Sequence, residues 1–326
     1  MSARVLTSWL FSSALAIVSV EAAAAGSMRA AVVRDGVVKV ETIPIPEPGA
    51  GQVRVKVHAA SVNPVDWKLA ARAAPGASST PGRDFSGVID AVGPSAGQWK
   101  VGDAVIGVGA GSYAEYMVAS VNAIAAKPTK MSFSEAAGMG VVAETAWRAM
   151  VTVSDVQKGQ KVLIHGGAGG VGSVAVQIAK ARGAYVIATA SARNHEFLKS
   201  LGADETIDYR STKFEDKVRN VDVVLNTVDG DTGSRSIGVV KQGGVLVSIV
   251  GPAPPEPCAA AKIRCEVTGS VNGQMLPQVV DLANAGKLHI PVAKRLTLAD
   301  AGKAWEESRD GHVRGKIILE VVPEST

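Results

Sequence analysis

Three glycines in the middle of the chain, Gly167, Gly169 and Gly172, have the GxGxxG spacing that suits a pyrophosphate. The first glycine permits a tight turn, the second lets backbone N–H groups approach the anion, and the third lets a helix pack closely on a strand. The unpaired N–H groups at a helix N-terminus also stabilise the anion. The pattern therefore predicts dinucleotide contacts from consecutive residues, namely Gly167, Ala168, Gly169, Gly170, Val171 and Gly172.

The stretches around these glycines have the order that a dinucleotide-binding unit requires. Val162 to Ile164 is a short apolar run typical of a buried parallel strand, and apolar residues recur at helical spacing from Val171 to Ala179. Gly183 then ends the helix, and Tyr185 to Ala188 begins a second strand. A strand, a glycine turn, a helix and a strand within about thirty residues favour a nucleotide site over a purely structural turn.

The residues after the second strand indicate which dinucleotide binds. An NAD site usually has Asp or Glu about twenty residues after the glycines, where it accepts a hydrogen bond from the ribose 2′-hydroxyl. Here that stretch contains Ser191 and Arg193, and the first acidic residue downstream is Glu196. A hydroxyl and a guanidinium suit a 2′-phosphate, so we predict NADPH as the cofactor. The alternative for Arg193 is a solvated surface charge.

Length and composition restrict the class of protein. A chain of 326 residues with 47% hydrophobic residues can form two globular domains with sizeable cores. The net charge of +4 is mild, only 4% of residues are aromatic, and no basic stripe has interleaved aromatics, so we expect no nucleic-acid partner. The two cysteines, Cys258 and Cys265, are too few for a disulfide scaffold or a four-cysteine metal site. They could pair in an exported protein, but we expect Cys265 to be a buried free thiol on a strand.

Residues 1–27 differ from the rest of the chain and resemble a secretory signal. An uncharged stretch follows Arg4, and a small-residue A-x-A pair ends at Ala25. The stretch is shorter than the roughly twenty apolar residues of a membrane span, so we expect no stable span. The alternative is a misplaced start, because Met28 begins a natural first strand. Both interpretations begin the fold near Met28; we favour the cytoplasm and keep an exported or periplasmic protein as the alternative.

The first part of the fold, residues 28–147, is predicted to be mostly β. It contains many short strand candidates with glycine turns, including two paired strands on either side of Asp35-Gly36. Ser132 and Glu135 fit a capping box that opens a helix running to Met150.

Strands alternate with helices over residues 148–272, which predicts a doubly wound parallel sheet with its ligand at the carboxyl ends of the strands. Within it we expect a helix from Ser234 to Lys241 that Gly243-Gly244 stops, and a loop at residues 251–257. Residues 273–326 are expected to add two helices and a final strand.

Short stretches spread in order over the chain after Met28 carry a family resemblance. They are SVNPVDWK (Ser61–Lys68), PGRDFSGVI (Pro81–Ile89), KVGDAVIG (Lys100–Gly107), YAEY (Tyr113–Tyr116), TAW (Thr145–Trp147), HGGAGGVG (His165–Gly172), ATASARN (Ala188–Asn194), LGADETIDY (Leu201–Tyr209) and RGKIIL (Arg314–Leu319). In these stretches the chain resembles the zinc-free, zeta-crystallin-like quinone oxidoreductases of the medium-chain dehydrogenase/reductase superfamily.

The resemblance implies an α/β fold, in which a Rossmann doubly wound parallel sheet is inserted in a GroES-like, mostly β catalytic domain. The catalytic domain would comprise residues 28–147 and 273–326, and the NADP(H)-binding domain residues 148–272. The resemblance also implies a homodimer and the NADPH-dependent reduction of quinones or α,β-unsaturated carbonyls.

The resemblance also bears on metal binding. The related zinc alcohol dehydrogenases use a catalytic Cys and a His-Glu pair, whereas Asn63 and Arg83-Asp84 stand in the corresponding stretches here. No cysteine precedes Cys258, so we expect no metal site of that kind. An unactivated ketone would then lack charge stabilisation. A quinone or enone is already electrophilic, and positioning against the nicotinamide can suffice for its reduction.

In similar enzymes the residue at Asn63 lies beside the nicotinamide, so we expect Asn63 to be the catalytic residue that orients the acceptor. Lys68 and Tyr113 are weaker candidates for stabilising the oxyanion, with Asp66 and Asp84 holding Lys68 by charge. The alternatives are a surface charge for Lys68 and core packing for Tyr113.

On the cofactor side, the resemblance places Thr145 near the nicotinamide ribose, and Tyr209 with Arg193 at the 2′-phosphate. Thr227 and Val250 are expected to supply backbone contacts at strand ends. Two other functions stay open at this point: an enoyl or alkenal reductase, and a protein that binds NADPH without turnover. A panel of acceptors would distinguish an enzyme from the second of these.

Overall fold

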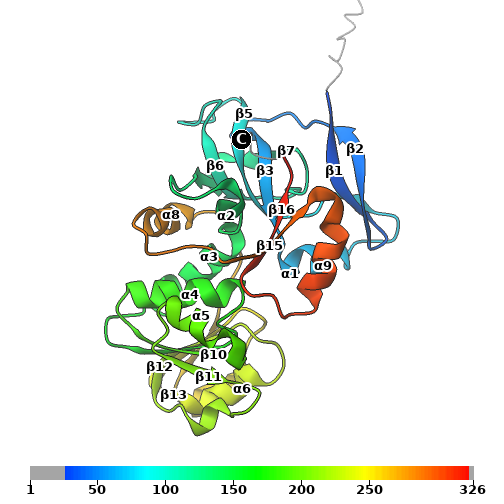
Figure 1. The fold of residues 1–326 in the computed structure, drawn as a ribbon. Coiled ribbons are helices and arrows are strands. Elements are labelled where there is room, and N and C mark those ends of the chain that lie inside the picture. The colour runs from blue at the N-terminus through cyan, green and yellow to red at the C-terminus, as the bar shows by residue number, and fades with distance from the viewer. Residues whose placement is uncertain (1–25, 323–326) are drawn as a thin grey trace, which may run out of the picture.

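The computed structural model describes residues 26–322, so most of the signal-like segment lies outside the described residues. Figure 1 shows a parallel sheet flanked by helices in one half of the molecule and mostly antiparallel sheets in the other. The predicted fold class is confirmed: a Rossmann-like sheet is combined with a GroES-like, mostly β part. No helix within the described range is long and apolar enough to cross a membrane.

The first two strands form the predicted hairpin. β1 (Ser27–Arg34) pairs antiparallel with β2 (Val37–Pro44), and the pair closes where Arg34 lies opposite Val37. Asp35 and Gly36 have φ values of 47° and 79°, the left-handed conformation that a two-residue hairpin turn requires at both positions. The short strand β4 (Ser78–Ser79) pairs with the other edge of β1.

The larger sheet of the other half is antiparallel except for the parallel pair β15 and β16, and it contains strands from both ends of the chain. Its members are β3 (Gln52–Ser61), β5 (Asp84–Val92), β6 (Ala104–Val108), β7 (Tyr116–Ser120), β8 (Ile124–Ala126), β15 (Val292–Thr297) and β16 (Lys316–Glu320). They lie in the order β15-β16-β3-β5-β6-β8, with β7 also paired to β3. β16 therefore brings the end of the chain beside β3, with Ile318 opposite Ser61. The sequence analysis did not predict β15.

The other sheet is parallel throughout. It consists of β9 (Lys161–Ile164), β10 (Tyr185–Ala190), β11 (Glu205–Asp208), β12 (Val221–Asn226), β13 (Val240–Ser248) and β14 (Arg264–Val267). The strand order is β11-β10-β9-β12-β13-β14. The chain order reverses direction between β9 and β12, and ligands of doubly wound sheets bind outside the carboxyl ends of the strands at such a switch point.

Helices bury both faces of this parallel sheet. On one face α4 (Gly170–Ala181) packs on β9 and β10, and α3 (Gly140–Trp147) and α8 (Leu276–Asn284) extend the same apolar core beyond it. On the other face α7 (Pro255–Ala260) contributes Cys258 to a second core. The central strands are buried on both faces, which is why their sequences are nearly continuous apolar runs.

The long helix predicted after Ser132 is divided in the structure. The capping box is present, since the Ser132 hydroxyl accepts from the Glu135 N–H at 3.2 Å. However, α2 (Phe133–Ala137) ends before Gly138, α3 begins at Gly140, and a π-helical segment follows from Arg148 to Val153. The break brings Gly140 against Asp84: a Cβ on Gly140 would lie only 2.4 Å from the Asp84 Oδ1.

Two predictions around β13 are wrong. The helix α6 (Thr232–Ser236) is followed by a 3₁₀ turn (Ile237–Val239), and β13 already begins at Val240, so Gly243-Gly244 lies inside a strand. Gly243 has a φ of 77°, and the pairing of β13 with β12 shifts register there, which indicates a bulge that glycine permits. Residues 251–257 are also not entirely a loop, because α7 starts at Pro255.

The expectation of a free thiol at Cys265 is wrong as well. Cys258 and Cys265 form a disulfide with Cα atoms 6.1 Å apart. Cys258 lies on α7 and Cys265 on β14, the outermost strand of the parallel sheet. The turn between α7 and β14 reverses the chain, which brings two residues seven positions apart within bonding distance.

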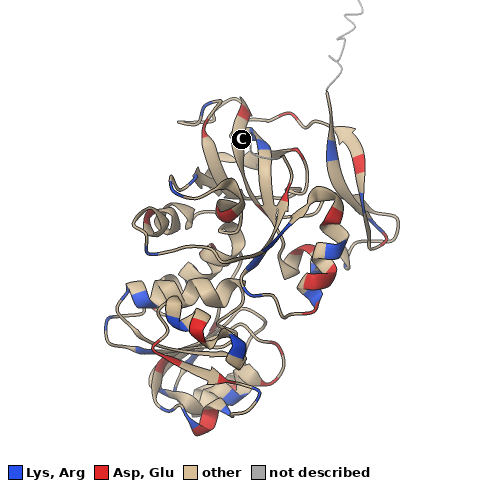
Figure 2. Cartoon of the chain, in the orientation of Figure 1, with Lys and Arg blue, Asp and Glu red and all other residues tan. Residues whose placement is uncertain are grey.

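Charged residues of both signs are interspersed over the elements drawn in Figure 2. Several form ion pairs between neighbouring strands or helices, such as Arg54 with Asp90 at 3.0 Å and Lys180 with Asp204 at 2.7 Å. Partly exposed pairs of this kind contribute about 0–1 kcal/mol each, so the fold depends mainly on its apolar cores.

Candidate functional site

The glycine turn lies between β9 and α4, as predicted. Its first helical hydrogen bond is donated by the Ser173 N–H to the Gly169 carbonyl at 2.9 Å, so the N–H groups of Gly170, Val171 and Gly172 precede that bond. No side chain caps the helix. An α-helix of this length with uncapped N–H groups can bind a pyrophosphate.

The space around each glycine matches the role expected of it. A Cβ on Gly172 would lie 2.3 Å from the Gly166 carbonyl oxygen, so only glycine permits this approach of the helix to the turn that follows β9. A Cβ on Gly169 would meet only the Gly166 oxygen, at 3.4 Å, so the outer side of the turn is open. Helix α3 lies beside the turn, since a Cβ on Gly170 would be 3.0 Å from Val142.

The predicted cofactor residues are gathered at the carboxyl edge of the parallel sheet. The positions that follow successive strands are the glycine turn after β9, Ser191 after β10, Tyr209 after β11, Thr227 after β12 and Val250 after β13. Thr145, on α3, is 7% exposed. An extended dinucleotide needs contacts spread along one sheet edge in this way.

At one end of this edge lie the groups predicted to bind the 2′-phosphate. Ala190 is paired with Asp208, so Ser191 and Tyr209 leave the sheet side by side. Ser191 is buried, whereas Arg193 is exposed and Tyr209 is 55% exposed. The Arg210 guanidinium lies 5.8 Å from the Tyr209 ring centroid, which adds a second cation that the sequence analysis missed.

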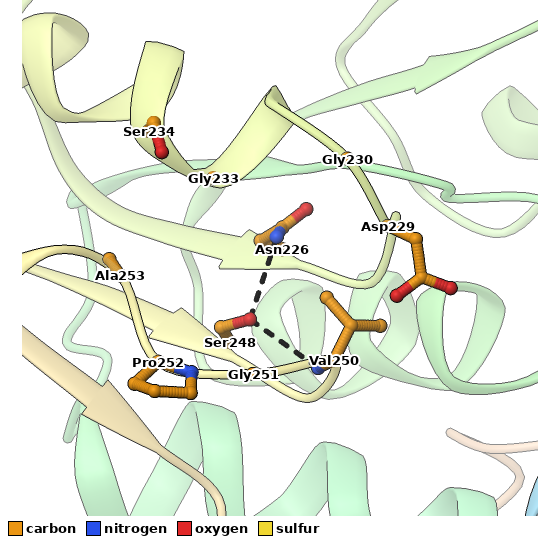
Figure 3. Close-up of a pocket in the computed structure, with 10 residues that line it drawn as sticks. All are labelled: Asn226, Asp229, Gly230, Gly233, Ser234, Ser248, Val250, Gly251, Pro252 and Ala253. Carbon is orange, nitrogen blue, oxygen red and sulfur yellow. Dashed lines mark hydrogen bonds between the residues drawn. The ribbon is translucent and has the colours of Figure 1, made fainter.

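At the other end of this edge, polar side chains accept hydrogen bonds from backbone N–H groups that follow β12 and β13. The Asn226 Oδ1 accepts from the Val228 N–H at 3.1 Å, and the Ser248 Oγ accepts from the Val250 N–H at 3.4 Å. Asn226 and Ser248 line a small pocket of about 130 Å³ together with Asp229 and Val250, drawn in Figure 3. These bonds fix the backbone on which Thr227 and Val250 are carried.

His165, which directly follows β9, is buried and has a structural role. Its ring nitrogens lie 3.2 Å from the Thr189 Oγ1 and 3.0 Å from the Ser236 Oγ. Burial lowers its pKa to about 4, so the ring is neutral near pH 7. The Thr227 hydroxyl donates to the His165 carbonyl at 2.7 Å, which ties β12 to the glycine turn.

In the antiparallel half, Asn63 lies in a buried polar cluster with Ser61, Asp84 and Lys316. The Asp84 Oδ2 accepts from the Ser61 hydroxyl at 2.8 Å and from the Asn63 Nδ2 at 2.9 Å, and its Oδ1 accepts from the Val141 N–H at 2.7 Å. The Lys316 ammonium donates to the Asn63 Oδ1 at 2.6 Å. Asn63 is 1% exposed, so both ends of its amide bind within the cluster.

Asp66 and Tyr113 adjoin this cluster. The Asp66 Oδ2 accepts from the Tyr113 hydroxyl and from the Asn63 N–H, each at 2.9 Å. Burial raises the pKa of Asp66 to about 7, and burial with the nearby Asp66 raises the pKa of Tyr113 well above its ordinary value. Tyr113 is completely buried and packs in the apolar core, which is the alternative that the sequence analysis gave to a role in stabilising the oxyanion.

Lys68 lies outside the cluster, which corrects the suggestion that Asp66 and Asp84 hold it. Its side chain is exposed, and its ammonium lies 5.5 Å from the Trp67 ring centroid. The lysine beside Asp84 is Lys316, with the Nζ 3.7 Å from the Asp84 Oδ2. The sequence signal for it was the lysine of RGKIIL, which falls on a core-facing position of β16.

A loop from the parallel half is held by side chains around α3 and β5. Buried Glu144, whose partner the sequence did not reveal, accepts from the N–H groups of Asn272 and Gly273 at 3.2 and 2.6 Å. The Arg83 Nη2 donates to the Val271 carbonyl at 3.2 Å. These bonds connect the two halves of the molecule beside the cluster. Within residues 26–322, no three His, Cys, Asp or Glu side chains are grouped so that they could hold a metal ion.

Comparisons with known proteins agree with this geometry. A model of the alcohol dehydrogenase GroES-like domain matches residues 49–129, and a model described as zinc-binding dehydrogenase matches residues 201–319. The chain is 32% identical over 306 residues to a chloroplast envelope quinone oxidoreductase homolog of Arabidopsis thaliana, covering 85% of this chain and 92% of the relative. It is 33% identical over 307 residues to 2-methylene-furan-3-one reductase of Solanum lycopersicum, covering 88% of this chain and 76% of the relative.

A solved mycobacterial structure complexed with NADPH superposes with a TM-score of 0.82 at 27% identity, over 90% of this chain and 100% of that one. The glycine turn, the parallel sheet order and these similarities agree on an oxidoreductase that uses a nicotinamide cofactor. The chain belongs to the zinc-free, quinone oxidoreductase-like family of the medium-chain dehydrogenase/reductase superfamily.

Proposed function

We propose that the protein is a zinc-independent oxidoreductase that uses NADPH to reduce a quinone or an α,β-unsaturated carbonyl. The observation that carries the proposal is the joining of two sites by β16: the uncapped N–H groups of the glycine turn and the buried cluster around Asn63. NADPH bound along the sheet edge would supply the hydride.

The residues of this chain would hold the dinucleotide along its length. The N–H groups of Gly170, Val171 and Gly172 would bind the pyrophosphate, while those of Gly167 and Gly169 donate to the Thr189 and Gly166 carbonyls and hold the turn in shape. Ser191, Arg193 and Tyr209 would bind the 2′-phosphate, because residues 191–195, directly after β10, include no carboxylate that would repel it. Thr145, Thr227 and Val250 line the nicotinamide end. Asn63, bonded to Asp84 and Lys316, would fix the shape of the site at its acceptor end.

The test is an acceptor panel with protein that begins at Met28. NADPH oxidation is followed with 1,4-benzoquinone, 9,10-phenanthrenequinone and an alkenal, and NADH is compared with NADPH. The proposal expects turnover with at least one conjugated acceptor and a lower KM for NADPH than for NADH. Tight NADPH binding without oxidation by any acceptor would favour the alternative of a non-catalytic, sensing or structural protein.

A second candidate is an enoyl or alkenal reductase, and the similarity to 2-methylene-furan-3-one reductase favours it. Both candidates need the same cofactor and the same kind of electrophile, so they differ only in the acceptor. Hydride addition to a C=C bond leaves a saturated product, whereas quinone reduction leaves a hydroquinone. Product identification by mass spectrometry separates the two.

We also propose a homodimer. β14 pairs only with β13 among the described strands, and Val267 on β14 is 48% exposed. An unpaired strand edge with an exposed apolar residue favours pairing with a second chain. Light scattering should give twice the mass of the chain, and a monomer at micromolar concentration would contradict the proposal.

The compartment is the remaining part of the proposal. The cytoplasm is where NADPH is abundant, whereas the disulfide between Cys258 and Cys265 supports the exported alternative. Fractionation of cells that express the full chain decides between them: cleavage after Ala25 with an oxidised pair indicates export, and an intact or Met28-initiated chain in the cytoplasm indicates the opposite.

A further inference from the structure

Lys316 is a buried lysine to which the sequence and the family resemblance assigned no role. It is the first residue of β16 and is 4% exposed. Its ammonium donates to the Asn63 Oδ1 at 2.6 Å and to the Val62 carbonyl at 2.8 Å. Since the same Asn63 amide donates to Asp84, the three side chains form a closed network in the core.

The same residue lies against the dinucleotide turn. The N–H of the preceding residue, Gly315, donates to the Ala168 carbonyl at 2.9 Å, and Gly315 is bridged to Gly169. A Cβ on Gly170 would lie 3.1 Å from the Lys316 Cδ. One strand start therefore contacts the phosphate-binding turn through its backbone and the Asn63 amide through its side chain.

The charged and titratable groups that face Lys316 come from β5, from α1 and from the loop between β6 and β7. Asp84 on β5 lies 3.7 Å away, Asp66 on α1 (Pro64–Ala70) acts at longer range, and Tyr113 is bonded to Asp66. Burial lowers the pKa of Lys316, and the two carboxyl groups oppose that effect. A buried ion pair usually contributes little net stability compared with apolar side chains of the same volume. Folding alone therefore does not explain the ammonium here.

We propose that Lys316 is a positioning residue for the reduction: its ammonium holds the Asn63 amide in one orientation and at a fixed distance from the dinucleotide turn. The inference rests on the proposed function. Without the ammonium the Asn63 Oδ1 loses its donor and the amide is held only through its Nδ2, which donates to Asp84, so the amide can tilt and the acceptor is no longer aligned with the nicotinamide. A displacement of about 1 Å in such a site can reduce the rate by two orders of magnitude.

This arrangement predicts a separation of kinetic effects. The contact with the glycine turn is made by the backbone of Gly315, so it survives replacement of the Lys316 side chain. Loss of the ammonium should therefore lower kcat by about 10- to 100-fold, while the Kd for NADPH stays close to that of the wild type. A merely structural role would lower stability and cofactor affinity together.

The experiment compares Lys316→Met with the double variant Asp84→Asn/Lys316→Met. The double variant removes both charges, so it avoids leaving Asp84 buried without its cation and is the one expected to fold. Lys294→Met is the matched control, because Lys294 lies exposed on the neighbouring strand β15 and pairs with Glu307 at 2.7 Å. Each protein is measured for Tm, for the Kd of NADPH and for kcat with the best acceptor of the wild type.

The pH dependence of kcat supplies a readout specific to the ammonium. Lys316 is charged below its pKa and loses its proton as the pH rises through it, so wild-type kcat should fall on the alkaline side below pH 10.5, the ordinary lysine value. This alkaline limb should persist in Lys294→Met and disappear in folded variants that lack Lys316. It can be measured on the wild type even where a variant does not fold.

The results separate this inference from the proposed function. If the wild-type protein does not oxidise NADPH with any of the acceptors tested, both the proposed function and the inference are refuted. An active wild type with an alkaline limb, and a folded double variant with unchanged NADPH affinity, reduced kcat and no limb, would support the inference. An active wild type without the limb, or a folded double variant with wild-type kcat, would overturn it and leave the proposed function intact.

Discussion

Replacing Gly172 with alanine tests the dinucleotide turn most directly. A Cβ there would lie 2.3 Å from the Gly166 carbonyl oxygen and 2.8 Å from the Gly167 Cα. Non-bonded carbon atoms prefer separations of about 3.5–4.0 Å, so the helix and the turn must separate by roughly 1 Å. Both contacts are with backbone atoms, and no side-chain rotation can relieve them.

The cost of such overpacking is about 1–3 kcal/mol. If this whole cost is taken from the free energy of NADPH binding, the Kd for NADPH rises about 5- to 150-fold. The same strain lowers the Tm by several degrees. Fluorescence titration with NADPH and thermal unfolding measure the two effects separately.

Two other glycines provide the comparison. A Cβ on Gly169 would meet only one atom, at 3.4 Å, so Gly169→Ala should keep the wild-type Tm. In the proposed binding mode its methyl would face the pyrophosphate, so the variant should bind NADPH more weakly. A Cβ on Gly238 would meet nothing within 4 Å, so Gly238→Ala should change neither quantity. Wild-type affinity for NADPH in both Gly172→Ala and Gly169→Ala would refute the placement of the dinucleotide at this turn.

Three further predictions concern the cofactor, the disulfide and pH. Arg193→Ala should raise the KM for NADPH about tenfold and leave the KM for NADH unchanged, because a charge-assisted hydrogen bond contributes about 1.5 kcal/mol or more; equal effects on both nucleotides in steady-state kinetics would contradict this. The double variant Cys258→Ser/Cys265→Ser should lose roughly 2–3 kcal/mol of unfolding free energy in denaturant titration, since the disulfide closes a short loop; an unchanged midpoint would argue against a bond in solution. Burial raises the pKa of Asp66 from 3.8 to about 7. The contribution of the neutral carboxyl group to the stability of the folded protein is therefore complete below pH 3.8 and is lost as the pH rises through 7. The Tm of the wild type relative to Asp66→Asn should therefore fall over that window in calorimetry, and a constant difference would contradict it; the opposing titration of His165 cancels because both proteins contain it.

The parts of the fold that sequence predicted correctly are those that local patterns specify. The Asp35-Gly36 hairpin needs left-handed backbone at two adjacent residues, and the strand, glycine turn and helix from Lys161 to Ala181 follow from residue type and periodicity. The predictions that were wrong concern residues whose local sequence is compatible with two different structures. Gly243-Gly244 can end a helix or permit a bulge in a strand, and only pairing with β12 selects the bulge.

The candidate site divides in the same way. The amino-acid sequence by itself determined the dinucleotide turn, the lack of an acid after β10 and the position of Asn63, because these depend on spacing along a short stretch of chain. Only the tertiary structure decided that Lys316 rather than Lys68 is the cation beside Asp84, that Glu144 holds the loop at Asn272, and that Cys258 bonds to Cys265. Such partners are selected by three-dimensional distance and burial, and for Lys316 and Asn63, more than two hundred and fifty positions apart, no local pattern specifies that distance.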